Sequence, residues 1–271
     1  MLTSLVIQVE AINDGEINGA TGRATHGFWY KQWEKADAKT ADALHDETQV
    51  PPFSLSPLME LPRAEKGITR VTRGVSTWFR VATLNGQLSE RLTTHWAAQL
   101  PDEVELAGVR WRIVGVADSP EKHPWANQIS YQDLSAKHLF NNRPPSRWKL
   151  SFETPVTFNS GLGHLPFPLP NNLIGSWMRR WQAFASLALP EELTQSVREQ
   201  LMVNHFNMVT IPVRQGKRVL IGGKGSYALH AIKMPASERA QVDLLVNYAF
   251  FCGSGYKTTQ GMGMTYIRPL A

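Results

Sequence analysis

Three side chains in the N-terminal part of the chain have types and spacing suited to proton transfer. His26 and Tyr30 are four residues apart, so a helix would place them on one face. His45 follows 15 residues after Tyr30, and a helix–turn–helix would return it toward that face. Histidine has an unperturbed pKa of about 6.5 and can exchange protons near neutral pH. Two such groups can act together as a general base and a general acid, because one removes a proton from an attacking hydroxyl and the other gives a proton to a departing oxygen.

A metal centre is the weaker interpretation of the same region. Asp46 and Glu47 follow His45, but the chain contains no H-E-x-x-H and no H-x-E…C-x-x-C pattern. Its single cysteine, Cys252, excludes an internal disulfide and a cysteine zinc cluster. We therefore predict neither a metal nor another cofactor.

The densest motif is the stretch GSGYKTTQGMG at residues 253–263, in which two G-x-G units flank a polar insert containing Lys257. Glycine permits positive φ and lets backbone N–H groups approach a flat or charged ligand. We expect a helix before this stretch, at 237–251 with Ser237 as N-cap, and a short strand after it, at 264–268. The order helix, loop, strand excludes the dinucleotide-binding fingerprint, which needs a strand before the glycines and a helix after them.

Composition indicates a globular protein of one large domain or two ordinary ones. Of its 271 residues, 42% are hydrophobic and 19% are charged, which is unlike a disordered chain. No apolar run approaches the roughly 20 residues of a membrane span, and the N-terminal residues lack the basic start of a signal peptide. We expect a cytoplasmic location and no membrane partner.

Charge is distributed unevenly along the chain. Residues 1–146 carry 15 Lys and Arg against 17 Asp and Glu, whereas residues 147–271 carry 13 against 6. No acidic residue occurs between Glu199 and Glu238. A basic half indicates a polyanionic partner, with a solvated basic face as the alternative.

Two rounds of the same element order are recognisable. The first comprises a strand at 2–10, helices at 26–33 and 36–46 with a break near Asp37, extended residues at 53–58, a strand at 71–84, a helix at 88–100 and one or two strands at 104–116. The second comprises a strand at 148–158, a helix at 173–187, strands at 209–213 and 219–232, and then the final helix, glycine stretch and strand. A β-α-β-β-α-β order predicts an α+β protein of two tandem ferredoxin-like (RNA-recognition-motif-like) domains, 1–125 and 147–271. They are joined by a linker region at 126–146, within which residues 129–140 could form a helix.

The glycine stretch resembles the glycine-rich loop of the CRISPR-associated RNA-processing superfamily, and in particular that of its repeat-cleaving endoribonucleases. The loop pattern fits completely, as Gly253, Gly255, Lys257, Gly261, Met262 and Gly263. Further segments similar to the family are LHD at 44–46, PFSLSPL at 52–58, WFRV at 78–81 and FETPVTF at 152–158.

This resemblance implies a metal-independent endoribonuclease that cuts CRISPR precursor RNA within its repeats by 2′-hydroxyl attack, leaving a 2′,3′-cyclic phosphate and a 5′-hydroxyl. The family position of the active histidine corresponds to His45, with Tyr30 or His26 as its partner. Some members have a lysine shortly after that histidine, where this chain has VPP at 50–52. The cation that stabilises the transition state would then come from the glycine loop or from one of the helix lysines Lys31, Lys35 and Lys39. A non-catalytic tandem module that holds or delivers CRISPR RNA is the alternative.

Basic side chains of the second half are the expected phosphate contacts. The predicted RNA-binding residues are Arg179, Arg180, Lys217, Arg218 and Lys224, together with Gly253, Gly255, Lys257, Gly261 and Gly263 of the loop. The expected partner is CRISPR repeat RNA, other Cas effector subunits are further candidates, and a monomer or a homodimer is expected.

Overall fold

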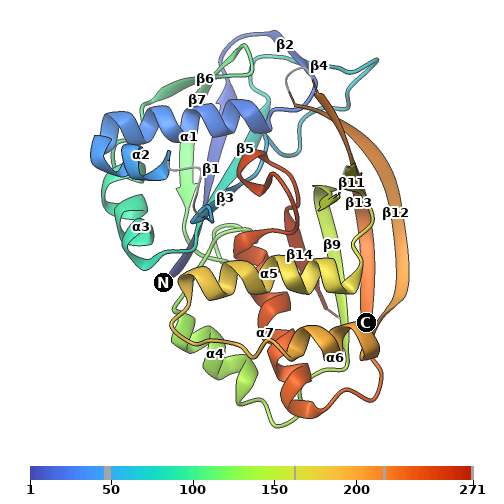
Figure 1. The fold of residues 1–271 in the computed structure, drawn as a ribbon. Coiled ribbons are helices and arrows are strands. Elements are labelled where there is room, and N and C mark those ends of the chain that lie inside the picture. Colours follow the sequence, from blue (N-terminus) through green and yellow to red (C-terminus); the bar gives the residue numbers. More distant parts are fainter. Residues whose placement is uncertain (46–49, 162, 216–217, 270–271) are drawn as a thin grey trace. The chain divides into compact units, whose positions relative to one another are not determined.

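The computed structural model describes residues 1–45, 50–161, 163–215 and 218–269, which form two compact units (Figure 1). The first unit comprises 1–128 together with 259–261, and the second comprises 129–258 together with 262–271. None of the helices within the described ranges has the length and apolar content needed to cross a lipid bilayer.

The first unit is built on a six-stranded sheet with the path β3-β5-β1-β7-β6, and β8 also pairs with β1. Its strands are β1 (Leu2–Ala11), β3 (Phe53–Leu55), β5 (Ser76–Thr83), β6 (Glu103–Leu106), β7 (Val109–Ala117) and β8 (Asn127–Ile129). A separate ribbon pairs β2 (Gly15–Asn18) with β4 (Ile68–Val71), and the sequence predicts neither strand. Central β1 is buried along most of its length, and it pairs antiparallel with β5 on one edge and with β7 on the other.

The helices of the first unit are α1 (Gly22–Ala36), α2 (Ala38–Leu44) and α3 (Gly86–Arg91), which continues into a π-helical segment (Leu92–Ala97). The predicted break near Asp37 is confirmed. Its carboxylate accepts a hydrogen bond from the Thr40 amide at 3.3 Å, which satisfies an unpaired donor at the start of α2.

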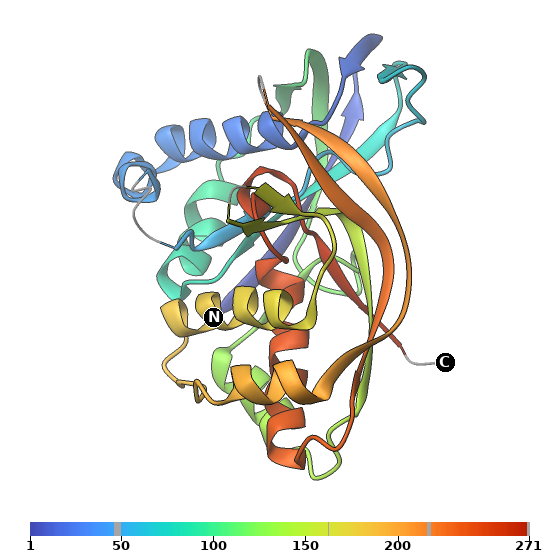
Figure 2. The ribbon, with the colours of Figure 1, turned by 45° about the vertical axis from the view of Figure 1, so that its right-hand side comes forward.

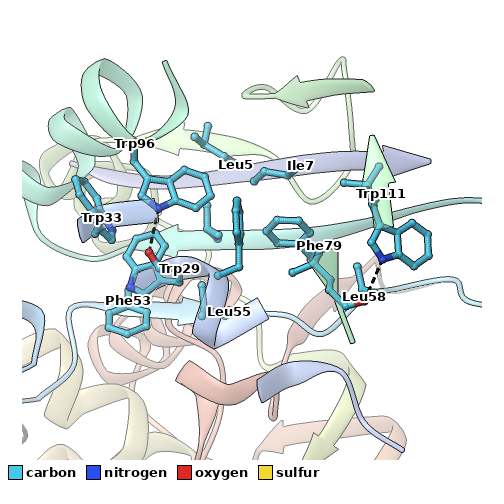
Figure 3. Packing of buried hydrophobic residues seen from close by; sticks show 14 of the residues in the cluster. Leu5, Ile7, Trp29, Trp33, Phe53, Leu55, Leu58, Phe79, Trp96 and Trp111 are labelled. Carbon is cyan, nitrogen blue, oxygen red and sulfur yellow. Dashed lines mark hydrogen bonds between the residues drawn. The ribbon is translucent and has the colours of Figure 1, made fainter. Parts of the chain in front are cut away.

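A tryptophan cluster anchors α1 in the core of the first unit (Figure 3). Trp29, Trp33 and Trp96 are fully buried, and the Trp29 ring centroid lies 5.5 Å from that of Trp33 and 5.4 Å from that of Trp96. The Trp96 indole also donates to the Trp29 carbonyl at 3.3 Å. With these residues fixed in the core, His26 and Tyr30 lie on the half-exposed part of the same helix.

The second unit contains a four-stranded antiparallel sheet with the order β12-β13-β9-β14. Its strands are β9 (Arg147–Val156), β12 (Leu201–Gln215), β13 (Arg218–Ala231) and β14 (Thr265–Arg268), and a small ribbon pairs β10 (Phe158–Ser160) with β11 (Gly163–Leu165). Figures 1 and 2 show β12 and β13 as a long curved hairpin. Strand β12 begins at Leu201, well before the predicted start at Val209, because the polar residues between hide its extended character in the sequence.

The helices of the second unit are α4 (Tyr131–Leu139), α5 (Pro170–Phe184), α6 (Leu193–Gln200) and α7 (Ala236–Cys252). The stretch 126–146, expected as a linker region, holds β8 and α4. Helix α6 was not predicted, because its buried apolar residues are only Leu193 and Val197, too few for a periodic signal. The expected Ser237 N-cap is wrong, since α7 begins at Ala236 and Pro235 occupies the cap position without a side-chain hydrogen bond.

Both units share one topology. The chain passes through β1, α1, β3, β5, α3 and β7 in the first unit, and through β9, α5, β12, β13, α7 and β14 in the second. Each sheet places these strands in the spatial order second, third, first, fourth. The predicted α+β fold with two tandem ferredoxin-like domains is confirmed.

Candidate active site

The structure brings His26, Tyr30 and His45 together in the first unit. The His26 and Tyr30 ring centroids are 5.0 Å apart with an edge-on orientation, as expected for neighbours one helical turn apart. His45 directly follows α2 and stacks on Tyr30, with centroids 4.3 Å apart and an interplanar angle of 21°. The helix break at Asp37 lets α2 fold back along α1, which brings His45 beside Tyr30.

Tyr30 links the two helices. Its hydroxyl donates to the Leu44 carbonyl at 3.0 Å, which holds the end of α2 beside α1. The His45 ring, which stacks on the Tyr30 ring, is exposed. Tyr30 therefore orients His45, and its hydroxyl proton is already committed to a carbonyl acceptor.

His26 has a defined tautomer. Its Nδ1 lies 2.9 Å from the Thr259 carbonyl oxygen, and a carbonyl can only accept, so Nδ1 carries the hydrogen. In the neutral ring the basic nitrogen is then Nε2. Thr259 belongs to the short segment 259–261 that packs within the first unit.

That segment lies against the first turn of α1 through two glycines. A Cβ on Gly22 would lie 2.1 Å from the Gln260 carbonyl oxygen, and one on Gly261 would lie 2.9 Å from the Gly22 Cα. Both positions therefore require glycine for backbone contact, and this contact holds Thr259 beside His26.

The lysines of α1 and α2 that could supply a cation are exposed. Lys31 and Lys35 on α1 and Lys39 on α2 make no ion pair with any residue that the structure describes. Over the described ranges, no three His, Cys, Asp or Glu side chains gather as a metal site would require. Asp46 and Glu47 lie outside those ranges.

The remainder of the glycine-rich loop, in the second unit, packs on itself. A Cβ on Gly263 would lie 1.9 Å from the Ser254 carbonyl oxygen, and one on Gly255 would lie 2.3 Å from that of Thr157. Gly253, Gly255 and Gly263 all have positive φ. Amide donors with protein acceptors are those of Gly253 (to Ala249 O), Ser254 (to Gly263 O), Gly255 (to Ser176 Oγ), Tyr256 (to Thr157 O), Met262 (to Lys257 O) and Gly263 (to Pro155 O). The expectation that loop amides close on a ligand is therefore wrong at these positions, where the glycines permit internal packing.

Arg179 and Arg180, predicted together as phosphate contacts, have different environments. Arg180 is only 4% exposed, and its guanidinium donates to the Cys252 carbonyl and to Thr258 Oγ1. It fastens the glycine-rich loop to α5, so its assignment as a phosphate contact is wrong. Arg179 is exposed. The sequence contains the signal for this difference, since Arg180 continues the apolar spacing of Leu173 and Trp177 and Arg179 does not.

The other predicted cations lie on the loop and the hairpin. Lys257 is half-buried at φ 58°, with Nζ 5.1 Å from the Tyr256 ring centroid. Arg218 and Lys224 are exposed on β13. Lys217 lies outside the described residues.

Comparison with protein families identifies the chain. Residues 1–136 match the model of the CRISPR Cas6 N-terminal domain, and residues 150–265 match that of the CRISPR-associated endoribonuclease Cas6. The chain belongs to the Cas6 family.

Cas6 proteins of known sequence and structure resemble it throughout. The CRISPR-associated endoribonuclease Cas6 of Mycobacterium tuberculosis is 23% identical over 217 residues, which is 78% of this chain and 64% of that relative's length. A Thermus thermophilus Cas6 solved as a product complex is 23% identical, covers 99% of this chain and 100% of that one, and has a TM-score of 0.81. Another Cas6 product complex is 26% identical, covers 99% of both chains and has a TM-score of 0.79.

Sequence reasoning missed one contact of this candidate site. The Thr259 carbonyl defines the His26 tautomer, yet the two residues are 233 positions apart. No local pattern connects them. In the sequence, only the resemblance of both segments to one family links them.

Proposed function

We propose that this chain is a metal-independent endoribonuclease that cuts CRISPR precursor RNA within its repeats. The 2′-oxygen upstream of the scissile phosphate attacks phosphorus, and the bond from phosphorus to the 5′-oxygen breaks. The products are a 2′,3′-cyclic phosphate and a 5′-hydroxyl. The observation that carries the proposal is the exposed His45 ring stacked on Tyr30, with His26 edge-on to the same tyrosine.

The geometry supports His26 as the partner of His45 in proton transfer. The Thr259 carbonyl leaves Nε2 as the basic nitrogen of neutral His26, while the Tyr30 hydroxyl donates to Leu44. Two histidines can supply the acid and the base, each transfer contributing about 10²–10⁴-fold to the rate. Tyr30 is then a positioning residue that holds His45.

The second unit is the proposed RNA-binding part. Its exposed cations Arg179, Arg218 and Lys224, and the absence of acidic residues between Glu199 and Glu238, favour a polyanion. The Cas6 relatives solved as product complexes support repeat RNA as that polyanion. We place the protein in the cytoplasm, as a monomer or a homodimer, with other Cas effector subunits as further proposed partners.

The reaction class is tested with a repeat RNA taken from the array of the same genome. Cleavage should survive excess EDTA, because the proton transfers use side chains. It should be abolished by a single 2′-deoxy nucleotide upstream of the scissile phosphate, while that RNA still binds. Loss of cleavage in EDTA, or cleavage of the deoxy substrate, would contradict the proposal. Binding of repeat RNA without cleavage under every condition would instead support an RNA-holding module.

The residue roles are tested by single-turnover rates. His45→Ala and His26→Ala should each lower the rate by at least about tenfold with nearly unchanged RNA affinity. Tyr30→Phe should have a smaller effect, because the stacked ring remains. His95→Ala, an exposed histidine on the π-helical segment, is the matched control and should cleave like the wild type. Equal losses in Tyr30→Phe and His45→Ala would make Tyr30 the partner instead.

A further inference from the structure

A pocket of about 260 Å³ lies in the second unit between α5, β10 and the glycine-rich loop. Helix α5 contributes Asn171 and Asn172 from its first turn, and Gly175 and Arg179 from the next two turns of the same face. The volume is just below the roughly 300–1,000 Å³ typical of pockets for drug-sized ligands. It therefore suits a small group of nucleotide size.

The charge of the pocket favours an anion. No Asp or Glu lines it, and Arg179 makes no ion pair with any residue in the described ranges. Although Arg179 is exposed, partial desolvation by its surroundings and the neighbouring Arg180 cation lower its pKa. Because the positive end of the α5 dipole lies beside Asn171 and Asn172, the pocket has a second source of positive potential.

The aromatic ring of Tyr256 lines one wall of the pocket. The Tyr256 ring is half-buried and stacks on His164, with centroids 5.4 Å apart and an interplanar angle of 16°. The Tyr256 amide donates to the Thr157 carbonyl at 2.8 Å, and the Gly255 amide donates to Ser176 Oγ at 3.1 Å. These bonds fix the loop backbone against the β9–β10 junction and α5, and the stack on His164 supports the ring itself.

Gly175 is unexplained by packing. It lies in the middle of a 15-residue helix, where glycine costs about 1 kcal/mol relative to alanine. A Cβ built on it would meet no atom within 4 Å, and its φ is not in the left-handed region. Neither a close contact nor the backbone conformation requires glycine at this position. The missing side chain leaves the space beside this turn of α5 open.

We propose that this pocket binds one unpaired nucleotide of the RNA. Arg179 contacts its phosphate, Tyr256 stacks on its base, and the amides of Asn171 and Asn172, each able to donate and accept, contact the edge of the base. Stacking on an aromatic side chain contributes about 1–3 kcal/mol per base. The inference rests on the proposed function only in taking RNA as the ligand, and it assigns no part in cleavage to the pocket.

Filling the pocket tests the proposal in the full chain. The probes are a fluorescein-labelled single-stranded RNA 12-mer and a blunt-ended RNA hairpin, followed by fluorescence anisotropy. Gly175→Leu should weaken binding of the single strand by about tenfold, the loss of one stacked base, and should leave hairpin binding unchanged. Gly175→Ala is the matched control and should bind the single strand within about twofold of wild type. Both variants should melt no lower than wild type, because leucine and alanine favour helix.

A second variant tests the pocket assignment independently, in case Gly175→Leu does not fold. Arg179→Gln keeps a hydrogen-bonding side chain but removes the charge, and should lower the salt slope of single-strand binding by about 0.7. An unchanged slope, or wild-type single-strand affinity in a folded Gly175→Leu protein, would overturn the pocket assignment. Saturation of the wild type by free AMP, CMP, GMP or UMP, with unchanged single-strand affinity in Gly175→Leu, would make it a free-nucleotide site and would also overturn it.

The two proposals can fail separately. If the wild type cleaves repeat RNA and Gly175→Leu binds the single strand like wild type, only the pocket assignment falls. If no repeat is ever cleaved but Gly175→Leu loses single-strand affinity, the endoribonuclease proposal falls and the nucleotide pocket stands.

Discussion

The candidate site on α1 and α2, formed by His26, Tyr30 and His45, differs from the glycine-rich loop in the atoms that are available to a ligand. The first presents side chains, with His45 exposed and supported by Tyr30. The loop is largely buried, and its amides at 253–256, 262 and 263 bond within the protein. A glycine-dense motif suggests backbone donors for a ligand, yet here the glycines let the backbone pack on itself. A glycine-rich motif can therefore serve to fix the shape of the backbone, while the proposed chemistry belongs to side chains elsewhere in the chain.

The largest expected effect that would test this contrast is on folding. Gly263→Val should lower the free energy of unfolding by about 3 kcal/mol or more, because its Cβ would collide with the Ser254 carbonyl at a φ of 68°. Gly161→Val is the matched control, since Gly161 also has positive φ but a Cβ there meets no atom within 4 Å. Thermal melting and soluble yield measure both. Equal stability of the two variants would show that the loop is not tightly packed and would restore a ligand-binding role for its amides.

A smaller effect should separate Arg180 from Arg179. Arg180→Ala should cost about 2–4 kcal/mol of stability, because it removes buried, charged hydrogen bonds to the Cys252 carbonyl and to Thr258 Oγ1. Arg179→Ala should melt like wild type and lose RNA affinity instead. Guanidinium denaturation and binding titrations on the same preparations check this. The reverse pattern would contradict the assignment of Arg180 to the loop and Arg179 to the RNA.

The smallest expected effect concerns the turn that delivers His45. Asp37→Ala should cost about 1 kcal/mol through loss of the α2 cap, and should slow cleavage less than His45→Ala does. Hydrogen bonds from Thr40, aided by the Arg91 cation, hold the pKa of Asp37 below its ordinary value. Its stabilising contribution is therefore present above the ordinary carboxyl pKa and is lost as the pH falls through the lowered one.

Melting curves from about pH 7 to about pH 3 check that sign. The difference between wild type and Asp37→Ala should shrink toward the acid end. Asp42→Ala, on the same helix with an exposed carboxylate, should match wild type at every pH. A difference that grows in acid would show that Asp37 does not act as an ionised cap.

Local patterns in the sequence determined much of this protein. The β-α-β-β-α-β order, the break at Asp37 and the helix–loop–strand order around the glycines all follow from periodicity and from chain-breaking residues. The closeness of His26 and Tyr30 likewise follows from their four-residue spacing. These features are predictable because each depends on residues within one or two turns of one another.

Only the tertiary structure decided which groups the functional region exposes. Helical spacing already indicates that Arg180 and not Arg179 faces the core, but only the packing of α5 against the loop gives the Arg180 guanidinium its acceptors on Cys252 and Thr258. The Thr259 carbonyl determines the His26 tautomer from 233 residues away. The pocket beside Gly175 exists because three distant segments leave space there. Such features depend on which remote surfaces meet and which hydrogen bonds they use up, and that information is absent from any local stretch of the chain.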